Sequence, residues 1–251
     1  MIQISGTVIN PNTMDFPFAA NSIEGTIIRI LSSSDAIYSY GSPNELEFEL
    51  SLRKSIIDAA RDLSKTHFSF RTFRKSICNP DFWERTDEGG FLLKEGVKPS
   101  DAILDIYKNS KEYGTECATA IVIIYYKALT AVYPRELFDR TFREIYLMDW
   151  QNLDPQLGIG HYRDVKDFLP GDCRYFSNPD VDPLTPQWQG ENAIDLGDGT
   201  FYGHGPGIAT AEQMIAILNT FRKEGADTSA YLMDSATRPN FRYLAYKIMT
   251  L

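Results

Sequence analysis

The longest regular pattern of apolar and polar residues in the N-terminal third of the chain has helical spacing. Between about Pro43 and about Leu63, apolar residues recur every three or four positions, which places them on one face of a helix. Ser42 and Glu45 have the spacing of a capping box, and proline suits the first helical position. The pattern therefore predicts a long amphipathic helix that begins at Pro43.

A second long helix is predicted from near Cys117 to just before Pro134, where the proline ends it. Its residues 118–126 form the strongest apolar run of the chain, but a membrane span takes about 20 apolar residues, so we expect a buried helix. Shorter helices are expected from Ser100 through Tyr107, from Pro134 to Arg143, and from the capping box of Thr210 and Gln213 to Gly225.

Other stretches have the pattern of strands and turns. Residues 1–35 carry β-branched residues between prolines and asparagines, which favours short strands, one of them at Gly25–Leu31. A further strand is predicted at Ile145–Trp150, and residues 158–190 are expected to be mostly loop. A hairpin is predicted from Asn192–Leu196 and Thr200–Gly203 around Gly197-Asp198-Gly199.

This order of elements, with helices first and a late hairpin followed by a helix, indicates an α+β fold. No internal repeat and no Gly/Ser linker divides the chain, so we expect one domain over residues 1–251.

Composition narrows the class of protein. With 43% hydrophobic and 24% charged residues among 251, the chain is expected to fold. Three cysteines do not make a disulfide scaffold and favour a reducing compartment. A net charge of −9 argues against a nucleic-acid-binding protein. The first residues lack the pattern of a signal peptide, so we expect synthesis inside the cell without secretion by that route.

One of the three cysteines has a position that suits a nucleophile. Cys117 stands at the predicted start of the long apolar helix, where the helix dipole and unpaired N–H groups stabilise a thiolate. The alternative is a buried cysteine that packs as a small hydrophobic residue. Cys78 precedes Asn79-Pro80 in a turn-like context, and Cys173 lies in Gly171-Asp172-Cys173.

A cysteine nucleophile needs a base, and His204, just after the predicted hairpin, is the natural choice from the residues alone. Glu191 precedes the hairpin and Glu116 adjoins the thiol, although an arbitrary glutamate is more often a solvated surface charge. His204 itself has the alternative of a hydrogen-bonded loop residue. No CxxC motif, no close histidine pair and no phosphate-binding loop is present, so no metal and no cofactor are predicted.

Several segments resemble the Bacillus spore transglutaminases, which are protein-glutamine γ-glutamyltransferases. The resemblance extends from about Asn44 to about Arg238. It is carried by ECATAIVIIYY at 116–126, GDCRYFSNP at 171–179, QWQGEN at 187–192, His204-Gly205 and SAYL at 229–232.

This resemblance implies a calcium-independent enzyme with an NlpC/P60-like, papain-related core, in which a helix-borne cysteine packs on a small antiparallel sheet. It also implies that the nucleophile is Cys117 and its partner Glu191, with Glu116 able to substitute in part. The activity it implies is the formation of ε-(γ-glutamyl)lysine cross-links between glutamine- and lysine-bearing spore coat proteins. The enzyme would then be made in the mother cell and end on the spore coat, and we expect it to act as a monomer.

The residues alone favour His204 as the base, whereas the resemblance implies Glu191. Ordinary pKa values of about 8.5 for a thiol and about 4.3 for a glutamate leave a gap of about 4 units, or roughly 6 kcal/mol. We expect the helix N-terminus to lower the thiol pKa and burial to raise the carboxyl pKa. We therefore adopt Glu191 as the partner and assign His204 an auxiliary role.

Three aromatic residues in the matching segments, Phe70, Trp150 and Trp188, are predicted to line a narrow channel that keeps water from a thioester. The alternative for each is ordinary packing. Two other functions remain open. One is a papain-like or NlpC/P60-type cysteine hydrolase that uses His204, and the other is a non-catalytic coat protein that keeps the fold.

Overall fold

The computed structural model describes residues 1–9, 18–150 and 152–250. The helices are α1 (Ile23–Ser33), α2 (Pro43–Ser64), α3 (Pro99–Lys108), α4 (Cys117–Val132), α5 (Arg135–Thr141), α6 (Ala211–Asn219) and α7 (Phe241–Met249). The main sheet has the strand order β13 (Gly207–Thr210), β12 (Thr200–Gly203), β11 (Gly190–Asp195), β10 (Cys173–Ser177), β15 (Ser235–Arg238) and β9 (Gly160–Arg163), and β14 (Tyr231–Leu232) also pairs with β10.

Smaller sheets flank this frame. They are β2 (Thr7–Val8), β1 (Ile2–Ile4) and β3 (Tyr38–Tyr40), then β4 (Ser69–Phe70) with β7 (Gly114–Thr115), then β5 (Trp83–Arg85), β6 (Phe91–Leu93) and β8 (Tyr146–Leu147). The expected mixture of helix and sheet is therefore confirmed.

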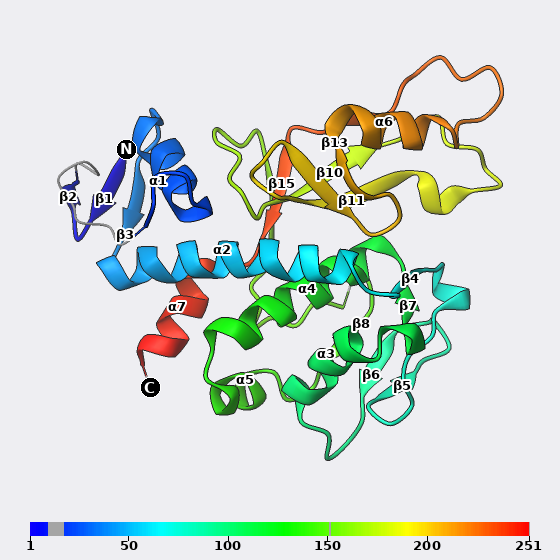
Figure 1. Ribbon diagram of the computed structural model, residues 1–251, viewed down its shortest axis with the longest axis horizontal. Helices are drawn as coiled ribbons and strands as arrows, with labels where there is room; N and C mark the ends of the chain where they lie inside the picture. Colours follow the sequence, from blue (N-terminus) through cyan, green and yellow to red (C-terminus); the bar gives the residue numbers. More distant parts are fainter. Residues whose placement is uncertain (10–17, 151, 251) are drawn as a thin grey trace.

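Helix α2 runs through the middle of the molecule, between the main sheet and helices α3 to α5 (Figure 1). It packs along α4, and both helices contact β11 of the main sheet. Helix α6 contacts β13 and β14 of the same sheet. At its N-terminal end α2 packs against α1, and Leu46 and Leu50 share a hydrophobic cluster with Ile27 and Leu31 of α1. The main core thus lies around α4.

Both long helices follow their sequence patterns. Helix α2 begins at Pro43 and the Ser42 side chain accepts the Glu45 N–H, although the Glu45 carboxylate reaches one residue further, to the N–H of Gly41 at 2.7 Å. Helix α4 is buried from Cys117 to Tyr126, which explains why its apolar run has no polar face. The hairpin of β11 and β12 and the full capping box of α6 are also confirmed.

The strand predicted at Gly25–Leu31 is wrong, because these residues belong to α1. Ser22 accepts the N–H of Gly25 as an N-cap, and Ile27 and Leu31 lie one helical turn apart on the buried face. Packing of this face against α2 outweighs the weak preference of isoleucine and threonine for strands.

Several predicted boundaries also differ from the structure. Helix α3 begins at Pro99 and is not capped by the side chain of Ser100. The strand predicted at Ile145–Trp150 is reduced to Tyr146–Leu147, and the segment expected to be loop contains β9 and β10. Helix α6 ends at Asn219, so Gly225 does not close it and instead occupies a later turn with φ of 71°. The expectation of strands in residues 10–17 lies outside the described residues.

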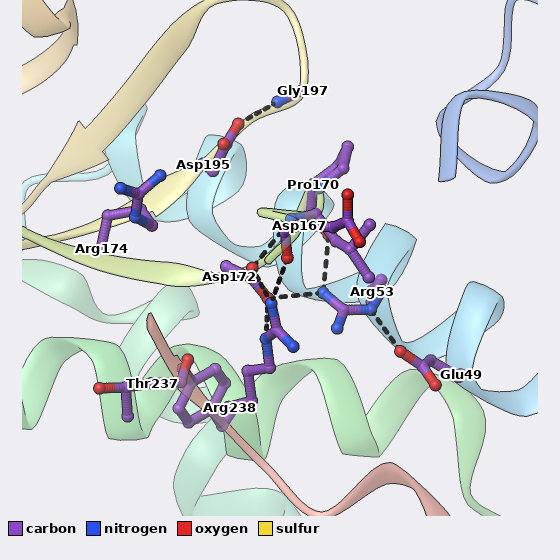
Figure 2. Close-up of polar contacts among 12 residues, drawn as sticks. Glu49, Arg53, Asp167, Pro170, Asp172, Arg174, Asp195, Gly197, Thr237 and Arg238 are labelled. Atoms are coloured by element: carbon purple, nitrogen blue, oxygen red, sulfur yellow. Dashed lines mark hydrogen bonds and ion pairs between the residues drawn. The ribbon is translucent and has the colours of Figure 1, made fainter. Parts of the chain in front are cut away.

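A buried ionic cluster joins α2 to the main sheet (Figure 2). Asp172, which is 0% exposed, accepts hydrogen bonds from Arg53 of α2 at 2.8 Å and from Arg238 of β15 at 2.7 Å. Burial alone would raise the pKa of Asp172, but the two guanidinium groups hold it below its usual value. Arg53 also pairs with Glu49, so each buried charge has an opposite charge in contact.

We predict that Asp172→Asn lowers the free energy of unfolding by about 3–5 kcal/mol, because it leaves two buried guanidinium groups without their anion. Urea unfolding monitored by circular dichroism measures the change. The matched control is Asp58→Asn, which removes the exposed ion pair with Lys54 on the same helix and is expected to cost less than about 1 kcal/mol. Equal losses in the two variants would contradict the assigned role of the cluster.

Candidate active site

Cys117 is the first residue of α4, and the residue before it determines how the helix begins. The carboxylate of Glu116 accepts the N–H groups of Ala118 at 2.6 Å and Thr119 at 2.7 Å, so Glu116 is the N-cap. Burial raises the pKa of the Glu116 carboxyl, and these hydrogen bonds offset part of that rise. The local fold therefore follows from a glutamate that turns back on the helix it precedes.

Cys117 is among the residues that line a cleft of about 1060 Å³, and it is 9% exposed. Among the described residues, Asn192 is the residue that hydrogen-bonds to its sulfur, with Nδ2 3.5 Å from Sγ. The cleft is lined in part by Arg74, Glu88, Trp150, His161, Tyr175 and Asn192.

The thiol pKa differs from the sequence-based expectation. Burial raises the pKa of Cys117 well above its ordinary value, and the negative charges of Glu191 and Glu116 raise it further, whereas Asn192 lowers it. The expected lowering by the helix N-terminus does not prevail, because burial is the largest effect on the thiol and because the Glu116 carboxylate occupies two of the terminal N–H groups. The resting cysteine is therefore a thiol.

Glu191 lies on β11 and is 0% exposed. Its Oε1 accepts the N–H of Gly205 at 3.4 Å, and its side chain packs so closely on Gly203 that a Cβ there would lie 2.8 Å from Cγ. Its Oε2 is buried without a hydrogen-bond partner. Burial raises the pKa of Glu191 to about 8, as expected in direction, and the N–H groups of Gly205 and His204 hold it from rising further.

Within the described part of the chain, no hydrogen bond joins Glu191 or His204 to the sulfur of Cys117. The carboxyls of Glu191 and Glu116 nevertheless lie within electrostatic range of the Cys117 thiol, since both carboxylates raise its pKa. Catalytic hydrogen bonds are often long in substrate-free enzymes and tighten in the complex, so this geometry is compatible with either residue as a partner.

The imidazole of His204 is buried and both of its nitrogens are engaged. Nε2 lies 3.2 Å from the carbonyl oxygen of Ser69, and Nδ1 lies 3.2 Å from the hydroxyl of Tyr202. A carbonyl can only accept, so Nε2 carries the proton and Nδ1 accepts the tyrosine O–H. Burial lowers the pKa of His204 to about 4, so the ring is neutral. The centroid of this ring lies 4.6 Å from that of the Phe68 ring.

The three aromatic residues predicted for a channel fall into two groups. Trp150 lines the cleft and meets the ring of His161 edge-on at 5.6 Å. The ring centroids of Phe70 and Trp188 lie 5.0 Å apart, and Trp188 stacks on Phe221 with the centroids 4.3 Å apart. The structure thus brings Phe70 and Trp188 together and places Trp150 among the residues that line the cleft.

Sequence reasoning missed two residues of this region, Asn192 and Phe221. The signal for Asn192 was present, because strand alternation sends it to the face opposite Glu191, next to a helix that carries the thiol. Nothing in the local pattern indicates Phe221, whose contact with Trp188 joins segments far apart in the sequence.

Cys173 is buried and Cys78 is half-buried, and both are free thiols. In residues 1–9, 18–150 and 152–250, no group of three or more histidine, cysteine or acidic side chains is arranged to hold a metal ion. No helix in these residues has the length and apolar character that crossing a bilayer requires.

A cysteine at the N-terminus of a helix that also lines a cleft has the position that enzymes use for a nucleophilic thiol. Residues 1–248 match the sequence model of the protein-glutamine gamma-glutamyltransferases. The chain belongs to this family of acyltransferases, the transglutaminases.

Two relatives named protein-glutamine gamma-glutamyltransferase, from Bacillus cereus and Bacillus mycoides, are each 45% identical to this chain, over 248 and 254 residues. Each alignment covers 98% of this chain and 88% of the relative. A solved structure of the transglutaminase from Geobacillus stearothermophilus, without its C-terminal extension, is 52% identical and superposes with a TM-score of 0.79. That match covers 82% of this chain and 98% of the other.

The buried carboxyl of Glu191 gives a prediction for stability. Its pKa is about 8 in the folded protein and near 4.5 when exposed, so the unfolded state ionises first as the pH rises. The free energy of unfolding of Glu191→Gln, relative to wild type, should therefore increase by about 1.4 kcal/mol per pH unit between about pH 4.5 and pH 8. Above pH 8 this difference should stay constant.

Urea unfolding of both proteins from pH 4 to pH 9 measures this difference. Glu136→Gln, which removes an exposed charge on α5, serves as the control for a change of net charge. A difference between wild type and Glu191→Gln that does not change with pH would show that the carboxyl is ionised in the folded protein.

Proposed function

We propose that this transglutaminase forms ε-(γ-glutamyl)lysine isopeptide cross-links between spore coat proteins through a cysteine thioester, without calcium. Cys117 is the nucleophile and Glu191 its proton-transfer partner. The observation that carries this assignment is the buried Glu191 carboxyl, whose Oε2 has no hydrogen-bond partner in the described structure and whose pKa is about 8. A carboxyl with such a pKa can both accept and release a proton near neutral pH.

The first half of the proposed cycle forms the thioester. The Glu191 carboxylate takes the thiol proton, and the sulfur of Cys117 attacks the carboxamide carbon of a substrate glutamine. The C–S bond forms while the electrons of the C=O double bond move to oxygen. When the double bond reforms, the C–N bond breaks and the Glu191 proton leaves with the nitrogen as ammonia.

The second half transfers the acyl group to lysine. A lysine ammonium has an ordinary pKa of about 10.4 and must lose a proton before it can attack. The ammonium releases this proton to solvent, and Glu191, again ionised, takes a second proton from the nitrogen as the amine attacks the thioester carbon. That second proton passes to the sulfur as the C–S bond breaks. The products are the isopeptide bond and the free thiol.

Glu116 and His204 have supporting roles in this proposal. The Glu116 carboxylate caps α4 and lies close enough to the thiol to raise its pKa, so it is the group that can replace Glu191 in part. His204 contributes through its backbone N–H, which faces the Glu191 carboxyl, and its neutral ring fills the space beside Phe68.

Water competes with lysine for the thioester, and the aromatic residues reduce its access. The stack of Phe70, Trp188 and Phe221 covers the side of the site where Gly205 contacts both Trp188 and Glu191, while Trp150 covers the cleft. We propose that together they line the channel through which the two substrate side chains reach the sulfur.

The wider assignments rest on the resemblance described above. We propose an NlpC/P60-like, papain-related core within one catalytic domain, which acts as a monomer. We further propose that the enzyme is made in the mother cell and ends on the spore coat, where glutamine- and lysine-bearing coat proteins are its substrates.

The test of this function is the incorporation of a fluorescent primary amine into a glutamine-rich protein, in the presence of a calcium chelator. Cys117→Ala should abolish incorporation, because no other thiol lies at the cleft among the described residues. Cys173→Ala should retain it, because Cys173 is buried in the core.

The outcomes separate the alternatives. Release of ammonia or peptide by the wild type without amine incorporation would identify a cysteine hydrolase instead. A Cys117→Ala protein that still incorporates the amine would contradict the assigned nucleophile, and a requirement for calcium would contradict the assigned independence of metal.

The raised pKa of Glu191 predicts how the first half-reaction depends on pH. The carboxylate is the base, so the rate should rise about tenfold per pH unit up to about pH 8 and then level off. Single-turnover release of ammonia without added amine measures this step without the titration of lysine. Glu191→Gln should remove the inflection near pH 8, and a wild-type rate that is constant from pH 6 to pH 9 would contradict the proposal.

A further inference from the structure

Asn192 occupies a position at the thiol that the proposed cycle does not yet use. It follows Glu191 on β11, and the two side chains point to opposite faces of the sheet. Asn192 shares its face with Ile194, a residue of the core that contains α4, and it pairs with Tyr175 of β10. Asn192 is 9% exposed and its Nδ2 lies 3.5 Å from Sγ of Cys117.

The N-terminus of α4 offers one other donor beside the sulfur. The N–H groups of Ala118 and Thr119 bind the Glu116 carboxylate, and that of Ala120 binds the Glu116 carbonyl oxygen. The N–H of Cys117 itself has no acceptor among the described residues. The Glu116 cap therefore leaves a single terminal N–H free, on the residue that carries the sulfur.

We propose that Asn192 is a catalytic residue whose side-chain amide first stabilises the Cys117 thiolate and then, together with the Cys117 N–H, binds the oxyanion of the tetrahedral intermediate. This inference rests on the proposed function. The negative charge moves from sulfur to the former carbonyl oxygen as the C–S bond forms, and in the intermediate both atoms are bonded to the same carbon. A donor at the sulfur is therefore close to both positions of the charge.

The chemistry of the amide suits this role. The site already places two carboxyls near the thiol, and both raise its pKa. A neutral donor favours the anion without adding a charge that would require its own buried partner. An aspartate at position 192 would have the same shape and would add a third carboxyl.

The first test follows thiolate formation without any substrate. The rate of alkylation of Cys117 by iodoacetamide is measured from pH 6 to pH 10 on the full-length protein, with the adduct located by peptide mass spectrometry. Asn192→Ala and the nearly isosteric Asn192→Asp should both move the alkylation profile to higher pH, the aspartate variant further.

The matched control for this test is Asn178→Ala. Asn178 is a buried asparagine whose amide binds the backbone oxygens of Trp188 and Leu218 and not the sulfur. Its loss should affect stability without moving the alkylation profile. A profile that moves equally in the Asn178 variant would mean that the shift reports loosened packing and would overturn the proposal.

The second test measures catalysis. Loss of one oxyanion donor typically lowers kcat by about 10²–10³-fold, so Asn192→Ala should lower kcat by that factor with little change in KM for a glutamine peptide. An unmoved alkylation profile, or a kcat within threefold of wild type, would overturn the proposal. Failure of the proposed function has a different signature, because the wild type would then incorporate no amine while its alkylation profile still depended on Asn192.

Discussion

The structure depends on one buried carboxylate, Asp172, which accepts hydrogen bonds from arginines of two different layers. Arg53 belongs to α2, the helix against which α4 packs, and Arg238 belongs to the main sheet. Asp172 directly precedes β10, the neighbour of the strand that carries Glu191. This cluster therefore helps to fix the position of α4, which carries the Cys117 thiol, relative to β11, which carries the Glu191 carboxyl. Such charges are stable inside a protein only when all of them are paired, so the two layers have little freedom to shift separately.

Exclusion of water sets the chemistry of the site once these layers are in place. The same burial raises the pKa of the thiol and of the Glu191 carboxyl, so the resting pair is neutral. It also lowers the pKa of His204, which keeps a positive charge out of the region. A carboxyl in this setting can exchange protons near neutral pH, a task for which histidine is the usual choice in water. The preference for His204 drawn from the residues alone relied on pKa values in solution.

The sequence allowed prediction of those features that depend on local periodicity and capping. Helices α2 and α4, the late hairpin and the place of Cys117 at a helix start follow from such patterns. Helix α1 was mistaken for a strand because its isoleucines indicate only burial, and the contact with α2 that favours the helix is a tertiary contact that no local pattern encodes. The contact between Asn192 and the sulfur, and the stack of Trp188 on Phe221, join segments that only the packed fold brings together. The raised pKa of Glu191 likewise follows from burial, which no spacing encodes.

The Glu116 cap has a consequence for the chemical durability of the enzyme. Thiolate is the form that reacts with peroxides and exchanges with disulfides, whereas a protonated thiol reacts slowly. By binding two N–H groups of α4, the Glu116 carboxylate removes part of the positive field that would otherwise lower the pKa of Cys117. Together with burial, this keeps the sulfur protonated while the cleft is empty. In the cycle proposed above, the Cys117 sulfur would therefore be in its slowly oxidised form at rest and become reactive only when a proton is removed during catalysis.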